Sequence, residues 1–298
     1  YGPEEAYHRS EVVFRVSRPS TQELDLLKPG GVIIAFQHLA VIPKKNIDRF
    51  MELDITLLGY ELIEDETGDF PVLNPFSEMA GHMAIPLASA NLQAERGGRG
   101  ILIGTVPGVP PARSALGDGA HVLVLDDDMA KLRALSRELN GRPVTTMSTT
   151  ERLFRYTEIA DVVIGAVLIP GERAPFLVTE EMVKKMKQGS VIIDVSIDQG
   201  GCVETSRPTT LDQPTFIQHD VVHYCVPNMT ANVPRTASRV LTNVVLPYAK
   251  AIAQRGIAGA IQADSALARS VLVYQGKIVH AGLGEHFGNP VHNLDDLL

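Results

Sequence analysis

The prediction of the fold depends most on the stretch VIIDVSIDQGGCVETSRPTT at residues 191–210. It begins with a β-branched apolar run, residues 191–195, which is bounded by Gly189 before it and by a Gly-Gly pair after it. A short continuous apolar run between turn residues is typical of a strand that is buried on both faces of a parallel sheet. Asp198 follows where this strand should end. Ligands of open α/β sheets bind at the carboxyl ends of strands, so Asp198 is a candidate functional residue, and the alternative is a loop carboxylate that caps the next turn.

Strands and helices alternate in the N-terminal part of the sequence. Apolar runs at residues 11–18, 31–40 and 55–65 predict strands, and residues 43–53 have apolar positions at helical spacing. Such alternation predicts a parallel sheet with right-handed crossovers. His38 comes at the end of the second run, where its imidazole could exchange protons near neutral pH. A lone histidine after an apolar strand is more often structural, so its position alone leaves both interpretations open.

The middle of the sequence predicts a second α/β half. Residues 74–96 predict a long helix, interrupted at Pro86, and apolar runs at residues 121–125 and 161–168 predict further strands. Asp126 closes the first of these runs. An acidic residue at the end of the second strand of a mononucleotide fold accepts hydrogen bonds from the adenosine ribose, which favours NAD over NADP.

The glycine-rich loop of such a fold is absent from the sequence. A G-x-G-x-x-G motif should precede Asp126 by about 20 residues, but only residues 111–119, PARSALGDG, precede the strand that Asp126 closes. A parallel pair of strands needs a crossover of at least about a dozen residues. We therefore predict that residues are missing between about Ala112 and Leu116, and with them the first strand and helix of the nucleotide fold.

Composition excludes several classes of protein. A net charge of −8 with no cluster of Lys or Arg argues against nucleic-acid binding. No apolar run approaches the roughly 20 residues that span a bilayer, and the polar, acidic first residues are unlike a secretory signal. Cys202 and Cys225 lack the spacing of metal ligands and are typical of free thiols in a reducing cytoplasm. We therefore expect a cytoplasmic protein that acts on small molecules, with no metal and no nucleic-acid or membrane partner.

Beyond these patterns, the sequence resembles the alanine dehydrogenase family, which includes the α-subunit of nicotinamide nucleotide transhydrogenase. The resemblance covers nearly the whole chain and is carried by FQHLA at residues 36–40, GGRGILIGTVPGVPPA at 97–112, ADVVIGAVLIPGERAP at 160–175, IDQGGCVETSRPTT at 197–210 and HYCVPNMTANVPRTAS at 223–238. It implies an α/β fold of two Rossmann-like domains with parallel sheets. An NAD-binding domain, residues 77–235, would be inserted in a discontinuous substrate (catalytic) domain, residues 1–76 and 236–298.

The resemblance also implies an activity and roles for single residues. The activity is the reversible, NAD-dependent oxidative deamination of L-alanine to pyruvate and ammonia by a homohexamer. His38 would be the catalytic acid and base, Asp198 would orient the water that attacks the imine, and Asn228 would bind substrate. The residues implied at the cofactor are Ser77, Asp126, Lys131, Ser148, Val167, Leu168, Val195, Val226 and Met229. For two of them a structural role is an alternative: Ser77 as a helix N-cap, and Lys131 as a solvated lysine on a helix face.

The sequence departs from the family at the clamp for the substrate carboxylate. The family has a Lys-x-Lys-Glu-Pro run, which here reads RVSRP at residues 15–19, so that Ser17 replaces the substrate-binding lysine. Serine cannot supply that charge. Arg15 lies two residues earlier on the same strand face and could offer a bidentate fork, so we predict that Arg15 binds the substrate carboxylate. A further family arginine would lie upstream of the first residue of this sequence.

Three alternatives to this activity remain open, two of which follow from the departures from the family. Ser17 favours a related C–N oxidoreductase that acts on another 2-oxo acid. The absent glycine-rich loop favours a catalytically silent nucleotide-binding homologue, which the retention of both His38 and Asp198 opposes. A transhydrogenase α-subunit is less expected, because nothing membrane-facing follows the last predicted domain.

Overall fold

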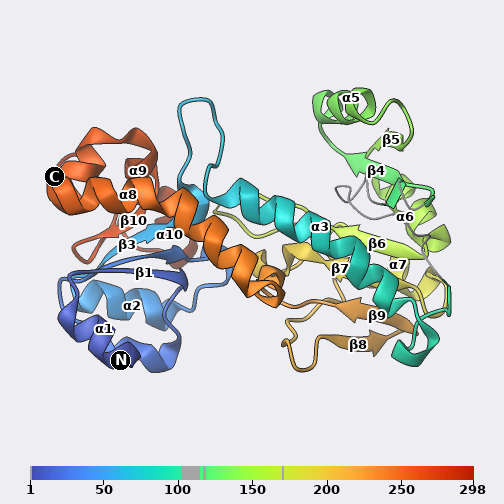
Figure 1. The fold of residues 1–298 in the computed structure, drawn as a ribbon, viewed down its shortest axis with the longest axis horizontal. Coiled ribbons are helices and arrows are strands. Elements are labelled where there is room, and N and C mark those ends of the chain that lie inside the picture. The colour runs from blue at the N-terminus through green and yellow to red at the C-terminus, as the bar shows by residue number, and fades with distance from the viewer. Residues whose placement is uncertain (1, 102–114, 117–118, 170) are drawn as a thin grey trace. The chain divides into compact units, whose positions relative to one another are not determined.

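The computed structural model describes residues 2–101, 115–116, 119–169 and 171–298, which form two compact units (Figure 1). The first unit comprises Tyr1–Phe76, Ile169–Arg173 and Val233–Leu298, and the second comprises Ser77–Leu168 and Ala174–Asn232. The second unit is therefore inserted in the chain of the first, and its two stretches are separated by the short segment Ile169–Arg173 of the first unit. Within the described residues, no helix has the length and apolar character needed to cross a membrane.

A mixed five-stranded sheet forms the centre of the first unit. Its strands in spatial order are β1 (Val12–Ser17), β2 (Val32–Phe36), β3 (Thr56–Gly59), β10 (Val271–Tyr274) and β11 (Lys277–Ile278). The first three strands are parallel, as predicted, whereas β10 runs antiparallel to both β3 and β11. The carboxyl ends of β1, β2 and β3 therefore share one edge of the sheet.

Helices cover both faces of this sheet, because successive apolar residues of a strand point to opposite faces. Ile34 and Leu58 belong to one hydrophobic core with residues of α8, and Ile33 and Leu57 belong to another with residues of α1 and α2. The helical elements of this unit are α1 (Pro3–Arg9), η1 (Thr21–Leu26), η2 (Leu39–Val41), α2 (Lys44–Glu52), η3 (Tyr60–Leu62), α8 (Pro234–Ala263), α9 (Ser265–Arg269) and α10 (Ala281–Phe287).

The second unit contains two separate sheets among its described residues. Strands β4 (Leu123–Asp126) and β5 (Val144–Met147) form a parallel pair, and the other sheet has the order β6 (Val162–Gly165), β7 (Val191–Asp194), β9 (Val221–Tyr224) and β8 (Thr215–Gln218). In that sheet β6, β7 and β9 are parallel and β8 is antiparallel. A doubly wound nucleotide fold places its first strand between the second and the fourth, which here are β4 and β6. No strand of the described residues joins these two, and the segment predicted to be incomplete, 112–116, lies mostly outside the described residues.

The four-stranded sheet is buried on both faces, as the β-branched run at residues 191–195 predicts. Ile192 packs against residues of α7, while Val191 and Ile193 pack against small residues of α3, among them Ala84 and Ala88. The helical elements that belong wholly or mainly to this unit are α3 (Leu73–Asn91), η4 (Ala94–Arg96), α5 (Met129–Glu138), α6 (Thr150–Ile159), α7 (Glu180–Lys185), η5 (Val195–Gln199) and η6 (Met229–Asn232).

Two predicted elements have different bounds in the structure. The strand of the opening stretch ends at Asp194, one residue early, and the chain then continues into η5. Helix α3 begins at Leu73, so that Ser77 lies inside the helix and the alternative of an N-cap role for Ser77 is wrong. Helix α8 extends to Ala263, although Gly256 interrupts it with φ 70° and ψ 173°.

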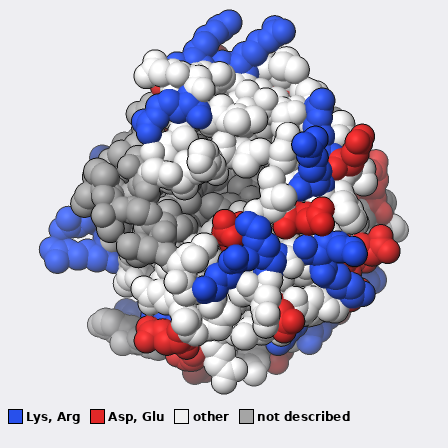
Figure 2. All heavy atoms as spheres, turned by 90° about the vertical axis from the view of Figure 1, so that its right-hand side faces the viewer, with Lys and Arg blue, Asp and Glu red and all other residues white. Residues whose placement is uncertain are grey.

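Charges of both signs are interspersed on the surface. Figure 2 shows one face, on which Lys and Arg side chains lie beside Asp and Glu at the centre and right of the view. Ion pairs within the second unit include Lys184 with Glu180 at 3.0 Å and Lys187 with Asp161 at 3.0 Å. These exposed pairs contribute little to stability individually.

Candidate active site

His38 occupies a strained position at the carboxyl end of β2. Its backbone has φ 49° and ψ 65°, the left-handed region, and it is the N-cap residue of η2. A residue other than glycine pays about 1–2 kcal/mol for this conformation. The imidazole is half-buried and stacks on Phe36, with ring centroids 6.0 Å apart and an interplanar angle of 21°. A strained backbone beside a titratable side chain is a candidate for a functional site.

The carboxylate of Glu61 binds the backbone of the His38 loop. Glu61 follows β3 in η3 and is only 2% exposed. Its two oxygens accept the N–H of Gln37, at 3.0 and 3.1 Å, and Oε1 also accepts the N–H of His38 at 2.6 Å. Gly59 leaves room for this carboxylate, because a Cβ there would lie 3.3 Å from Oε2 of Glu61.

Arg18 binds the same loop through its backbone carbonyl oxygens. Its guanidinium donates to the carbonyl oxygens of Gln37, at 2.8 Å, and of Val41, at 3.2 Å, so that it bridges the residues around His38. The sequence interpretation missed Glu61 and Arg18. The available signal was their position, because Arg18 directly follows β1 and Glu61 comes two residues after β3, and both strands run parallel to β2 and end at the same sheet edge.

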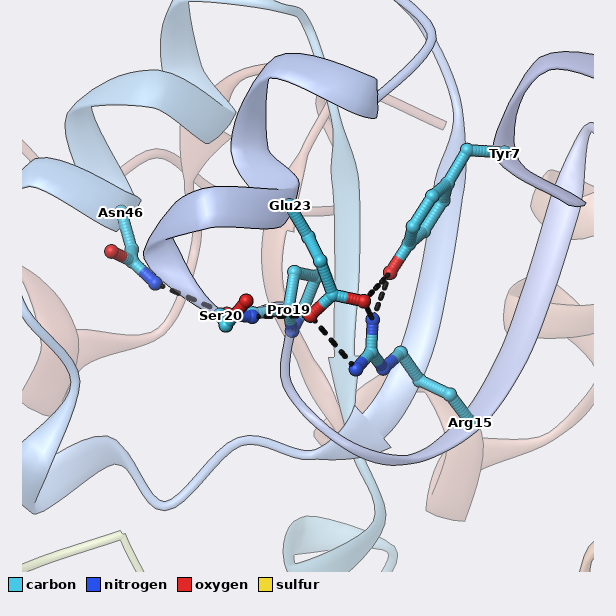
Figure 3. Close-up of polar contacts among 6 residues, drawn as sticks. All are labelled: Tyr7, Arg15, Pro19, Ser20, Glu23 and Asn46. Atoms are coloured by element: carbon cyan, nitrogen blue, oxygen red, sulfur yellow. Dashed lines mark hydrogen bonds and ion pairs between the residues drawn. The ribbon is translucent and has the colours of Figure 1, made fainter. Parts of the chain in front are cut away.

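Arg15 lies in a different network (Figure 3). Its guanidinium donates to both carboxylate oxygens of Glu23, at 2.9 and 3.2 Å, and to the hydroxyl of Tyr7. Burial raises the pKa of Glu23, but hydrogen bonds from Ser20 and Arg15 outweigh it, so that the pKa lies below its ordinary value. Arg15 shares its strand face with Val13, which packs on the core of α1 and α2, whereas Phe36 belongs to the core on the other face.

The prediction that Arg15 binds the substrate carboxylate is therefore weakened, since its charge is compensated by Glu23. It stays a prediction that a variant can test. Ser17, the residue at the family's lysine position, pairs with Phe36 in the parallel ladder and lies at the carboxyl end of β1.

In the second unit, Asp198 and Asn228 are brought together at the carboxyl ends of β7 and β9. Oδ1 of Asp198 accepts the N–H of Asn228 at 2.8 Å. Asn228 has φ 51°, and its side-chain oxygen accepts the hydroxyl of Thr230 at 2.9 Å. Both residues are half-buried. A hydrogen bond therefore joins two predicted site residues that are 30 positions apart in the chain and belong to different sequence motifs.

The loop of Asp198 is fixed from within its own segment. Asp194, buried at the end of β7, accepts the backbone N–H of Cys202 at 3.2 Å and of Val203 at 3.3 Å. Burial raises the pKa of Asp194, although these bonds and one from Ser206 oppose the rise. Gly201, with φ 79°, allows the close approach, because a Cβ there would lie 2.9 Å from Oδ2 of Asp194.

Ser196 is a further residue that the sequence interpretation missed. Its hydroxyl donates to the carbonyl of Val167 and accepts the N–H of Val167, both at 2.8 Å. The loop after β6 is thereby tied to the loop after β7. Val167 is one of the residues predicted to lie along the cofactor, and Ser196 fixes its backbone.

Two of the predicted cofactor residues, Asp126 and Ser148, lie at the ends of β4 and β5, and a third, Lys131, lies in α5. Ser148 follows β5, and its N–H donates to the carbonyl oxygen of Asp126 at 2.9 Å. The side chain of Asp126 accepts the N–H of Asp128 at 2.8 Å, and Asp128 in turn caps α5, where Lys131 is exposed. Asp126 thus lies at the end of a strand, the position from which the sequence predicts that it binds the ribose, and this role stays a prediction.

The remaining predicted cofactor residues differ in exposure. Ser77 and Leu168 are exposed, Val195 is half-buried, and Val226 and Met229 are buried in the core with α3. The backbone of the last two, rather than their side chains, is therefore what a ligand could contact. His38 belongs to the first unit and Asp198 to the second. In the described parts of both units, no group of three or more His, Cys, Asp or Glu side chains could hold a metal ion.

Two α/β units, one inserted in the other and each with parallel strands ending in polar loops, define a two-domain protein of the Rossmann type. Family models identify which one: the Alanine dehydrogenase/PNT N-terminal domain matches residues 2–80, and the corresponding C-terminal domain matches residues 84–281. The chain belongs to the alanine dehydrogenase/PNT family, and the resemblance seen in the sequence is confirmed.

Individual relatives agree with the family models. An alanine dehydrogenase of Staphylococcus haemolyticus is 40% identical over 97% of this chain and 81% of its own length, and one of Mycobacterium tuberculosis is 39% identical over 94% and 80%. A solved L-alanine dehydrogenase matches with a TM-score of 0.84 at 35% identity, over 96% of this chain and 83% of that chain. A transhydrogenase from Sinorhizobium meliloti, at a TM-score of 0.69 and 22% identity, shares the fold.

Proposed function

We propose that this protein is an NAD-dependent alanine dehydrogenase, which converts L-alanine, water and NAD to pyruvate, ammonia and NADH and runs in both directions. The observation that supports it most is that the two residues needed for proton handling, His38 and Asp198, each stand at the carboxyl end of a parallel strand in a loop fixed by hydrogen bonds. The family relationship supports the same reaction.

In this proposal the first unit is the substrate domain and the second is the NAD-binding domain. His38 exchanges a proton with the nitrogen or oxygen at C2 of the substrate. Asp198, oriented by the N–H of Asn228, positions the water that attacks the imine. NAD, when bound, accepts the hydride from C2, and Asp126 would hold its ribose.

Asp126 also gives the proposal a cofactor preference. A carboxylate facing the ribose would repel the 2′-phosphate of NADP, so kcat/KM should be higher with NAD. The comparison should be repeated with Asp126→Ser, which is expected to narrow the preference. Equal values for the two cofactors in the unaltered protein would show that Asp126 does not face the ribose.

Activity is measured as NADH oxidation with pyruvate and ammonia. A screen of other 2-oxo acids with ammonia tests the alternative of a different substrate, which the serine at position 17 favours. A fluorescence titration with NADH separates a silent homologue from an enzyme of another specificity: the silent nucleotide-binding protein would bind NADH and turn over none of the acids. We extend the proposal to a cytoplasmic homohexamer, to be tested by sedimentation velocity and by fractionation of the source cells.

A further inference from the structure

The backbone around His38 has a complete set of hydrogen-bond partners. The N–H groups of Gln37 and His38 both donate to Glu61, the carbonyl of Gln37 accepts from Arg18, and the carbonyl of His38 accepts the N–H of Val41 at 3.0 Å. Every polar backbone group of two consecutive residues is therefore fixed. The imidazole retains only its side-chain torsions, which stacking on Phe36 restricts.

Glu61 accepts backbone N–H groups at the point where strand pairing in the sheet ends. The parallel ladder between β2 and β3 ends with the pair Ala35 and Gly59, after which the chain turns into η3. The N–H groups of the two residues that follow β2, Gln37 and His38, would have no strand partner there, and an unpaired buried N–H is costly. The side chain of Glu61 replaces the missing strand. Because a charged acceptor makes stronger hydrogen bonds than a carbonyl, it also offsets the strain of the left-handed residue.

We propose that Glu61 is a positioning residue for the reaction: it holds His38 in its left-handed conformation so that the imidazole is aimed at the substrate before binding. This inference rests on the proposed function, because it assigns to Glu61 an effect on turnover that passes through His38. Arg18 should have a smaller effect on the position of His38, since its guanidinium binds the same loop through neutral carbonyl oxygens. Neither residue needs to touch the substrate in this role.

The first test is a double-mutant cycle. Glu61→Gln keeps the shape but places an amide against two N–H donors, and it should lower kcat by about tenfold to a hundredfold, the range for a misplaced catalytic group. The NADH dissociation constant should stay unchanged. Glu66→Gln removes the same charge from an exposed residue of the same segment and should leave kcat within about twofold. Glu61→Asp, one methylene shorter, should not restore the rate.

The decisive value is the effect of Glu61→Gln in a His38→Ala background. If Glu61 acts through His38, the second substitution should lower the residual kcat by less than about twofold, because residues that work as a unit have non-additive effects. A full additional loss would show a structural role independent of His38 and would overturn the proposal. So would an unchanged kcat in Glu61→Gln alone.

A second measurement is independent of activity. In protein with ¹⁵N-labelled histidine, the amide proton of His38 donates to a carboxylate at 2.6 Å and should resonate downfield of the other histidine amides, an assignment that His38→Ala provides. Glu61→Gln should move it upfield, and Glu66→Gln should not. If the unaltered protein turns over no 2-oxo acid, the proposed function fails while this shift still reports whether Glu61 holds the loop. An unshifted His38 amide in Glu61→Gln would overturn the positioning role itself.

Discussion

The loops that carry His38 and Asp198 solve the same problem in different ways. Each follows a buried parallel strand and turns into a short 3₁₀ helix, and in each a buried carboxylate accepts two consecutive backbone N–H groups. Around His38 the carboxylate comes from another strand connection, 23 residues away, and the strained residue is His38 itself, the proposed acid and base. Around Asp198 it comes from Asp194, only eight residues before its partner Cys202, and glycine takes the left-handed conformation.

This difference shows where each loop is vulnerable. The carboxylate that binds the backbone of the Asp198 loop, Asp194, belongs to the same continuous stretch as the Gly-Gly pair that allows its approach, although Asp198 itself also binds Asn228. The His38 loop depends on the docking of β1 and β3 beside β2, because Arg18 and Glu61 come from the ends of those strands. Four predictions test this contrast, in order of decreasing expected effect.

The largest effect should come from removing the two functional side chains. His38→Ala and Asp198→Asn should each lower kcat by about 10² or more, the scale for loss of acid–base catalysis, with the NADH dissociation constant nearly unchanged. If the two loops serve one reaction, the double variant should be little worse than the poorer single variant. Near-normal rates in both single variants would remove the assigned roles.

The second prediction concerns the glycine of the Asp198 loop. Gly201→Ala should lower the free energy of unfolding by about 1–3 kcal/mol. The alanine would be held at φ 79°, a conformation unfavourable for a residue with a Cβ, and its Cβ would lie 2.9 Å from Oδ2 of Asp194. Gly288→Ala is the matched control, since Gly288 also has a positive φ, 68°, but a Cβ there meets nothing within 4 Å. Urea denaturation measures both. Equal losses would mean that the contact with Asp194 contributes nothing.

The third prediction decides what Arg15 does. Arg15→Ala should lower the free energy of unfolding by roughly 1–2 kcal/mol, because it leaves the half-buried Glu23 without its bidentate partner. Arg9→Ala removes an exposed pair with Glu5 and should change it by less than about 0.5 kcal/mol. The KM for pyruvate is measured on the same variants. A strong rise in KM with unchanged stability would instead support the substrate-binding role predicted from the sequence.

The smallest effect is a difference in pH dependence between the carboxylates of the two units. The pKa of Asp194 is raised above 3.8, so the native state binds more protons than the unfolded state. The contribution of Asp194 to stability therefore falls as pH rises from about 3.8 through its native pKa. Glu23 has a pKa lowered below 4.5, so its contribution is present above that value and is lost as pH falls through the native pKa.

Unfolding free energies of Asp194→Asn and Glu23→Gln, each compared with the unaltered protein over about pH 3 to 7, should therefore change with pH in opposite directions. Parallel curves for the two variants would contradict the assignment of burial as the dominant influence on Asp194. The comparison needs no activity and is independent of the proposed reaction.

Several features of this protein could be predicted from its sequence because they depend on neighbouring residues. The buried strand before Asp198, the glycines after it and the alternation of strands and helices all follow from local pattern, and the structure contains each of them. The sequence also placed His38 at a strand end, since an apolar run and its last residue are local information. The family followed from motifs of the same kind and is confirmed by the family models.

Only the tertiary structure could supply the partners of those residues. Glu61 and Arg18 reach His38 because parallel strands bring together ends that are 20 or so residues apart in the chain, a consequence of crossover connections. Alternation placed Arg15 on a strand face, but it could not show that Glu23 and Tyr7 already occupy that face. Sequence determines which side chains stand at the end of each strand, because side-chain direction has a fixed period along a strand. Which of them meet, and which charges are already compensated, is decided by the packing of strands and helices that lie far apart in the chain.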